Sequence, residues 1–142
     1  MQPYLDSLRD GPSAAGRDLY RQLDQAPFPV DIGFGYRSDY YSGQTFPQWD
    51  DGKFAGASVG IDFEWITTKS CGRRTVNGTL VHELTHVLQA SRGGNEATWS
   101  SWTSDNFDVL ERSANSATKS YYEQLGWDAT KWLNSLPGPW RP

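Results

Sequence analysis

The run from Thr75 to Ala90 constrains the fold of this chain more than any other segment. Glu83 is its only charged side chain. Its apolar residues recur at helical spacing: Leu80, Leu84, Val87 and Leu88. A segment with this pattern forms a helix that is mostly buried, so we predict a helix from about Thr75 to Ser91. The glycine pair at 93 and 94 is typical of a helix C-terminus and is expected to end it.

Both histidines of the protein lie in this helix, in the pattern His82-Glu83-x-x-His86. Residues four apart share one helix face, about 6 Å from each other, so His82 and His86 can bind one tetrahedral zinc ion. Glu83 is rotated by about 100° and can face a water on that zinc as general base. Ionisable groups on a buried helix need a partner such as a metal. The sequence therefore predicts a zinc site rather than two surface histidines.

A catalytic zinc site needs a third protein ligand and leaves one position for water. No histidine remains, and the position six residues after His86 is Arg92. Cys71, the single cysteine, lies upstream and is expected to be an ordinary free thiol. The third ligand is then a carboxylate downstream of the motif, and the candidates are Glu96, Asp105, Asp108, Glu111 and Glu123.

We choose Glu111, because it lies near the start of a second predicted helix, residues 107–125, and a packed helix gives a metal ligand a rigid base. The intervening segment is long enough for an antiparallel return beside the first helix. Glu96 is the main alternative, although it lies close to the end of the first helix. Asn115, one turn beyond Glu111, is expected to hydrogen-bond a ligating histidine or Glu111 and fix its orientation.

The first third of the chain predicts helix followed by strand. Residues 1–29 are expected to be helical, with Ser13 as the N-cap of a helix that continues to Gln25. Val30–Tyr36 alternates apolar and other residues with a period of two, which predicts a strand. Arg37–Lys53 is rich in Tyr, Ser, Gly and Asp and is expected to be a loop whose aromatic residues either cap the sheet or form a lid or substrate wall.

A second β region precedes the motif helix. Asp51-Gly52 is a turn signal, and residues 54–66 are expected to form one long strand or two short ones. Val59, Ile61, Phe63 and Trp65 would then share a face. The small residues of Ala55–Gly60 suit a strand edge that a peptide backbone could approach. After the motif helix, residues 95–106 are expected to be irregular and residues 128–136 to form a short helix.

Composition narrows the class of protein. A chain of 142 residues with 37% hydrophobic and 14% aromatic residues suits one folded domain, residues 1–142. The net charge of −4 makes nucleic acid an improbable partner and weakly favours basic substrates. One cysteine permits no intrachain disulfide. No apolar run approaches the ~20 residues of a membrane span. The N-terminus lacks the features of a signal peptide, which leaves a cytoplasmic protein, export by a dedicated machine, or a piece of a longer chain.

From Thr75 to about Gly126 the sequence resembles the gluzincin branch of the zincin-like metallopeptidases. That branch has His-Glu-x-x-His and a downstream helix with Glu-x-x-x-Asp. Here the second element is Glu111-Arg112-Ser113-Ala114-Asn115, with Asn in place of Asp. His-Glu-Leu-Thr-His-Val-Leu-Gln also resembles compact bacterial zincin-like domains of polymorphic toxins and secreted effectors. The resemblance implies an α+β, zincin-like fold: a small antiparallel or mixed sheet packed on the motif helix and a following C-terminal helix. It also implies a possible cognate inhibitor or immunity protein.

The expected activity is that of a zinc-dependent peptidase acting on a protein or peptide substrate. Glu83 would take a proton from the attacking water and pass it to the leaving amine. Without a third histidine, any side chain that stabilises the oxyanion must be a tyrosine or an arginine, and the sequence does not choose among Tyr40, Tyr41 and Tyr122. Two alternatives stay open: a zinc amidase on a non-protein amide, for example in the cell wall, and a non-catalytic binding module.

Overall fold

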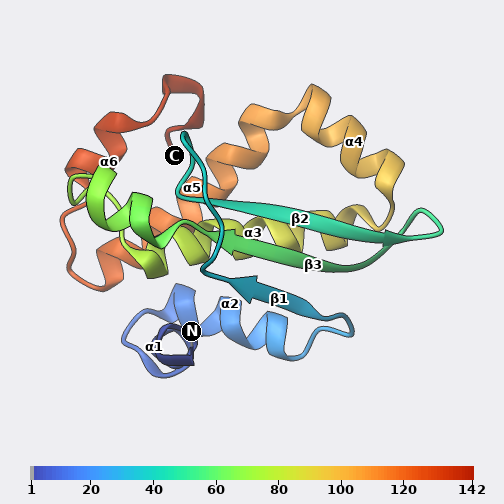
Figure 1. Ribbon diagram of the computed structural model, residues 1–142, viewed down its shortest axis with the longest axis horizontal. Coiled ribbons are helices and arrows are strands. Elements are labelled where there is room, and N and C mark those ends of the chain that lie inside the picture. Colours follow the sequence, from blue (N-terminus) through green and yellow to red (C-terminus); the bar gives the residue numbers. More distant parts are fainter. Residues whose placement is uncertain (1) are drawn as a thin grey trace.

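A small mixed sheet packed on helices makes up the computed structural model in Figure 1, which describes residues 2–142. The strand order is β1-β3-β2. Strand β1 (Val30–Gly33) runs parallel to the central strand β3 (Lys53–Ile61), and β2 (Gly43–Asp50) runs antiparallel to β3. The expected α+β class with a small mixed sheet is confirmed. No helix within residues 2–142 is both long and apolar enough to cross a membrane.

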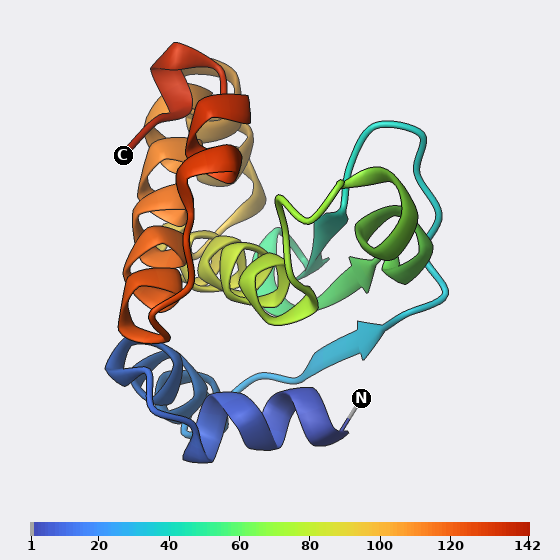
Figure 2. The same cartoon turned by 90° about the vertical axis from the view of Figure 1, so that its left-hand side faces the viewer.

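The motif helix is α3 (Val76–Gly93), and it lies between the sheet and α5 (Phe107–Gln124) (Figure 2). The Thr75 side chain caps its start by accepting the N–H of Gly78 at 2.9 Å. Gly94 ends it in the left-handed conformation, with φ of 76°. The predicted helix is confirmed, and packing on two sides explains why its apolar residues are not confined to one stripe.

Helices from both ends of the chain complete the core. Helix α1 (Gln2–Asp10) and helix α2 (Ala14–Asp24) lie together beneath α3 and the end of α5 (Figure 2). Ser13 caps α2 by accepting the N–H of Gly16 at 3.0 Å, as predicted. The short helix α6 (Thr130–Ser135) places Trp132 in the same buried cluster as Leu8 and Ile61. The core thus joins elements from the whole length of the described chain.

Strand β2 corrects the prediction that residues 37–53 are a loop. It pairs with β3 along its length, and Asp51 and Gly52, both at positive φ, form the turn between the two strands. The turn signal was therefore right, but the strand before it was missed. Its sequence, Gly-Gln-Thr-Phe-Pro-Gln-Trp-Asp, has few β-favouring residues, and only its pairing with β3 makes it a strand. Pro47 is tolerated because β2 is at the sheet edge.

Strand β3 differs from the prediction in two ways. It is the central strand, so Ala55–Gly60 is not an edge. It also ends at Ile61, and a π-helical turn, η1 (Trp65–Lys69), follows where more strand was expected. The carboxylate of Asp62 accepts the N–H groups of Ser38 and Trp65, which stabilises the turn and breaks the alternation. Asp62 is consequently buried, whereas Phe63 is 42% exposed.

Helix α4 (Glu96–Asp105) occupies the segment that was expected to be irregular. Asn95 caps it by accepting the N–H of Thr98 at 2.8 Å. None of its residues is fully buried, and its Ser, Thr and Trp residues are weak helix formers, so neither periodicity nor propensity signals it. After α5 and α6, a 3₁₀ turn, η2 (Gly138–Trp140), packs back onto α5.

Candidate metal centre

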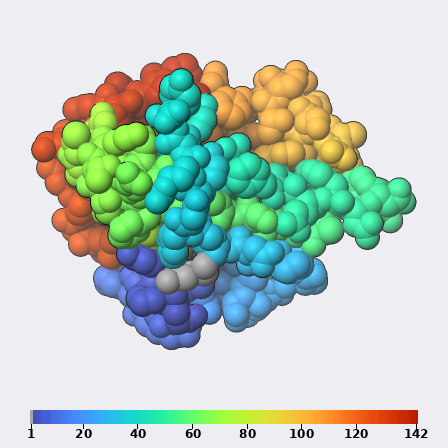
Figure 3. Space-filling model, in the orientation of Figure 1, coloured from blue at the N-terminus to red at the C-terminus, as the bar shows by residue number. Residues whose placement is uncertain are grey.

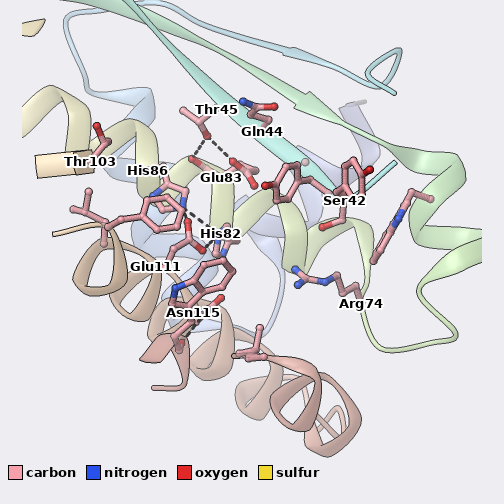
Figure 4. A pocket seen from close by; sticks show the side chains of 18 of the residues that line it. Ser42, Gln44, Thr45, Arg74, His82, Glu83, His86, Thr103, Glu111 and Asn115 are labelled. Carbon is pink, nitrogen blue, oxygen red and sulfur yellow. Dashed lines mark hydrogen bonds and ion pairs between the residues drawn. The ribbon is translucent and has the colours of Figure 1, made fainter. Parts of the chain in front are cut away.

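Three side chains converge at one place, two from helix α3 and one from helix α5 (Figure 4). The Nε2 atoms of His82 and His86, both on α3, lie 3.1 Å apart. Glu111 reaches them from α5, with carboxylate oxygens 3.3 Å from His82 Nε2 and 3.0 Å from His86 Nε2. Within residues 2–142 this is the one group of histidine, cysteine and acidic side chains close enough to hold a metal ion. Glu111, the carboxylate chosen from the sequence, is therefore the one that faces both histidines.

The other candidate carboxylates lie elsewhere, and all of them are exposed. Glu96 begins α4, where its backbone N–H bonds to the β2–β3 turn. Asp108 accepts a hydrogen bond from the indole of Trp140, and Glu123 pairs with Lys119 on the same helix. Asp105 accepts hydrogen bonds from two neighbouring serines. The structure therefore gives none of these side chains access to the two histidines. Cys71 is free and exposed, outside the group.

Gln89 determines how His86 presents its ring, and sequence reasoning missed it. The Gln89 amide nitrogen donates to the carbonyl of Leu110 at 3.1 Å, so its oxygen is left to accept from His86 Nδ1 at 2.7 Å. Neutral His86 then carries its proton on Nδ1 and directs the lone pair of Nε2 at Glu111. The bond to Leu110 also ties α3 to α5 directly beside Glu111. In the sequence, only its spacing of three residues from His86 could have indicated that Gln89 contacts this histidine.

The charges and lone pairs of His82, His86 and Glu111 favour a bound cation. Burial opposes ionisation of Glu111, yet hydrogen bonds with His82 and His86 lower the pKa of its carboxyl well below the usual range. Burial also opposes protonation of His86, but Glu111 and the charge of Glu83 raise the pKa of His86 above its ordinary value. A neutral His86 would direct a lone pair at a carboxylate oxygen 3.0 Å away. Either a proton or a metal ion between them removes that repulsion, so the donor set fits a divalent metal.

Within residues 2–142, the Nδ1 atom of His82 has no hydrogen-bond partner comparable to Gln89 at His86. The prediction that Asn115 bonds a histidine or Glu111 is wrong. Asn115 bonds neither histidine nor Glu111; its amide nitrogen donates to the carbonyl of Trp140 at 2.9 Å. Asn115 thus fastens η2 to α5. His82 Nδ1 and Asn115 Oδ1 are both buried and have no partner within the described residues.

Glu83 is not one of the three converging side chains. It is bound instead by a residue of strand β2. The hydroxyl of Thr45 lies 2.7 Å from Glu83 Oε2 and 2.9 Å from the Glu83 carbonyl, across 38 positions of sequence. The strand can approach so closely because residue 43 is glycine. A Cβ there would lie 3.0 Å from Glu83 Cγ and 2.9 Å from Thr79 Cγ2. Thr45 was missed because its segment was expected to be a loop.

We expect Thr45→Val to lower the kcat/KM of any reaction that uses Glu83 as a base by roughly ten- to a hundredfold. The reason is the loss of a hydrogen bond to a carboxylate, typically worth about 1.5–3 kcal/mol. Metal content should not change, because Thr45 touches none of the three converging side chains. Steady-state kinetics and metal analysis measure the two effects. Thr85→Val is the matched control, since the Thr85 hydroxyl bonds only the Val81 carbonyl within α3. Equal losses in both variants would contradict the assigned role.

The converging side chains lie in a cavity of about 370 Å³. It is lined by His82, Glu83 and His86 of α3, by residues 40–45 and Trp65, and by residues of α4, α5 and the C-terminal segment. Tyr40 and Tyr41 line it and are 81% and 57% exposed. The segment that carries them stands out on the surface, in cyan in Figure 3. Of the two expectations for these tyrosines, a wall of the cavity agrees with their position.

Tyr122 is not at the site. It is 1% exposed, and its hydroxyl accepts the backbone N–H of Thr75 at 3.1 Å, next to the start of α3. It packs so closely on α3 that a Cβ at Gly78 would overlap its ring and hydroxyl. Burial raises the pKa of its phenol. Tyr122 therefore positions the motif helix and cannot stabilise an oxyanion in the cavity.

No family model, no curated protein and no solved structure matches this chain. Functional inference therefore depends on the geometry alone. That geometry consists of two imidazoles and a carboxylate that could hold a metal, and a second carboxylate, Glu83, in the same cavity.

Proposed function

We propose that the protein is a zinc-dependent peptidase with a zincin-like active site. His82, His86 and Glu111 hold the zinc ion, and Glu83 is the general base. The observation that carries the proposal is that the two glutamates make different contacts in one cavity. Glu111 faces both histidines, whereas Glu83, adjacent to His82 in sequence, faces the same cavity and is bound by Thr45. A metal-activated hydrolase needs both a ligand set and a separate base.

The donor set supports the choice of zinc. Two histidine nitrogens and one carboxylate are a ligand combination of catalytic zinc, which keeps its fourth position for water or substrate. The cavity beside the three side chains supplies room for that fourth position. Gln89 gives His86 the outer hydrogen bond that ligating histidines usually make.

Each residue then has a defined task. Zinc held by His82, His86 and Glu111 would make the attacking water more acidic and polarise the scissile carbonyl. Glu83 accepts the proton of the attacking water and later delivers it to the departing amine. Thr45 holds the Glu83 carboxylate in one orientation. Glu111 keeps its negative charge throughout, since both histidines favour its ionised form.

A peptide substrate is favoured by the strand beside the cavity. Strand β2 is at the edge of the sheet, and Gly43, Gln44 and Thr45 line the cavity. An edge strand has backbone groups free to pair with an extended peptide. The peptide-binding edge is thus proposed at β2 and not at Ala55–Gly60, where the sequence placed it. An effector role and a cognate inhibitor stay predictions from the sequence.

The test combines metal analysis with a cleavage assay. Purified protein should contain about one zinc ion per chain. Incubation with a proteome-derived peptide pool, followed by mass spectrometry of new termini, should reveal cleavage that a chelator removes and added zinc restores. Hydrolysis of cell-wall muropeptides without cleavage of the pool would favour the amidase alternative. Absence of both zinc and hydrolysis would contradict the proposal.

A further inference from the structure

Arg74 is a cation in the cavity that the proposed chemistry does not use. It lies in the connection that leads into α3, is half-buried, and lines the cavity together with His82, Glu83 and Glu111. Figure 4 shows its side chain extending into the cavity from the side opposite Thr45. Among residues 2–142, no other lysine or arginine lines the cavity. Arg74 is therefore its only source of fixed positive charge from the described residues.

The guanidinium of Arg74 has no hydrogen bond or ion pair with any residue from 2 to 142. Every other arginine in that range makes at least one: Arg9, Arg17, Arg21, Arg37, Arg73, Arg92, Arg112 and Arg141. A guanidinium carries five N–H donors, and withdrawing it from water without an acceptor costs free energy. The fold thus leaves the N–H groups of the partly buried Arg74 guanidinium unpaired within the described chain, in the cavity where a ligand would bind.

The guanidinium of Arg74 keeps its positive charge in the cavity and can attract an anion. Burial lowers the pKa of the Arg74 guanidinium, but the nearby Tyr122, Glu83 and Glu111 act in the opposite direction, and arginine stays charged. Glu83 and Glu111 are engaged with Thr45 and the two histidines. They attract Arg74 without neutralising it by contact. An incoming carboxylate would meet two parallel N–H groups whose spacing matches its oxygens.

We propose that Arg74 binds a carboxylate of the substrate, so that the enzyme prefers peptides with a carboxylate close to the scissile bond. This inference rests on the proposed peptidase function. The carboxylate is either the C-terminus of a short peptide or the side chain of Asp or Glu. The preference opposes the weak bias toward basic substrates that the net charge of −4 suggests. A local, partly buried charge outweighs net charge in deciding what fits the cavity, because distant surface charges are screened.

The test uses one short synthetic peptide library in four matched forms. The forms are a free or an amidated C-terminus, and Asp/Glu or Asn/Gln at the varied positions. Wild type should cleave one carboxylate form about tenfold or more faster than its amide counterpart, and the form preferred identifies the source of the carboxylate. In Arg74→Met the KM for that form should rise by about the same factor, while kcat/KM for the amide forms stays nearly unchanged. Arg74→Lys should restore part of the preference, because lysine keeps the positive charge but lacks the two parallel N–H groups of arginine.

Arg73→Met is the matched control, because Arg73 bonds the Ser70 carbonyl and does not line the cavity. Thermal unfolding and zinc content show whether each variant is folded and loaded. Equal cleavage of carboxylate and amide forms by wild type would overturn the inference. So would a kcat in Arg74→Met that falls equally for all forms, which would instead make Arg74 an oxyanion stabiliser.

A binding measurement separates this inference from the peptidase proposal. Zinc-loaded Glu83→Gln is titrated calorimetrically with carboxylate and amide peptides, with and without Arg74→Met. A carboxylate preference that disappears with Arg74→Met supports the inference even if no peptide is cleaved, in which case only the peptidase function fails. Equal binding of both forms overturns the inference even if cleavage is observed.

Discussion

Glu83→Gln should reduce peptide hydrolysis by about a thousandfold while zinc stays bound. A glutamine amide cannot accept the proton of the attacking water, and general base catalysis contributes about 10²- to 10⁴-fold. The fold should survive, because the glutamine oxygen can still accept from the Thr45 hydroxyl. Zinc should remain, because Glu83 is not among the three converging side chains. Peptide cleavage kinetics, zinc analysis and thermal unfolding measure the three quantities.

The matched control for this variant is Glu96→Gln. Glu96 was the alternative ligand from the sequence, and it is exposed at the start of α4. Wild-type activity is expected in Glu96→Gln. Loss of zinc in Glu83→Gln would show that Glu83 is a ligand and not the base. Undiminished cleavage in Glu83→Gln would rule out the mechanism proposed above.

Glu111→Gln should abolish stoichiometric zinc binding and, with it, activity. The change keeps the size of the side chain and removes the charge that faces His82 and His86. At a zinc concentration of about 100 times Kd, binding stabilises a folded protein by about 2.7 kcal/mol. Wild type should gain about that much on zinc addition, and Glu111→Gln should gain almost none. Asp108→Asn, on the same helix but exposed and bonded to Trp140, should behave as wild type.

The same site makes the effect of zinc depend on pH. Burial opposes the charged form of His86, but Glu111 and Glu83 raise its pKa, so its contribution to stability is full below about pH 6.5 and lost as pH rises through the raised pKa. The lowered pKa of Glu111 acts oppositely: its contribution is present above about pH 4.5 and lost as pH falls through the lower value. Zinc needs a deprotonated histidine. Zinc should therefore raise the Tm more at about pH 8 than at about pH 6, and equal shifts would contradict this linkage.

Helices α2 and α3 were the most predictable part of the fold, because their signals are local, whereas neither periodicity nor propensity signals α4, which was missed. Ser13 and Thr75 cap α2 and α3 with their own side chains, and Gly94 ends α3, all within a few residues of sequence. The strands were less predictable. β2 is a strand only because β3 pairs with it, and Asp62 ends β3 by bonding Ser38, 24 positions away. Such partners are distant in sequence, so no local pattern signals them.

The sequence by itself placed His82, Glu83 and His86 on one buried helix and, by elimination, left a carboxylate as the third candidate ligand. Two histidines in the whole chain and a single charge in the run from Thr75 to Ala90 were sufficient for this. The tertiary structure decided that Glu111, which the sequence favoured over Glu96, faces both histidines, because α5 returns beside α3. It also decided what surrounds them. Thr45 contacts Glu83 across 38 positions of sequence and Gln89 bonds the Leu110 carbonyl across 21, and no local pattern signals either contact.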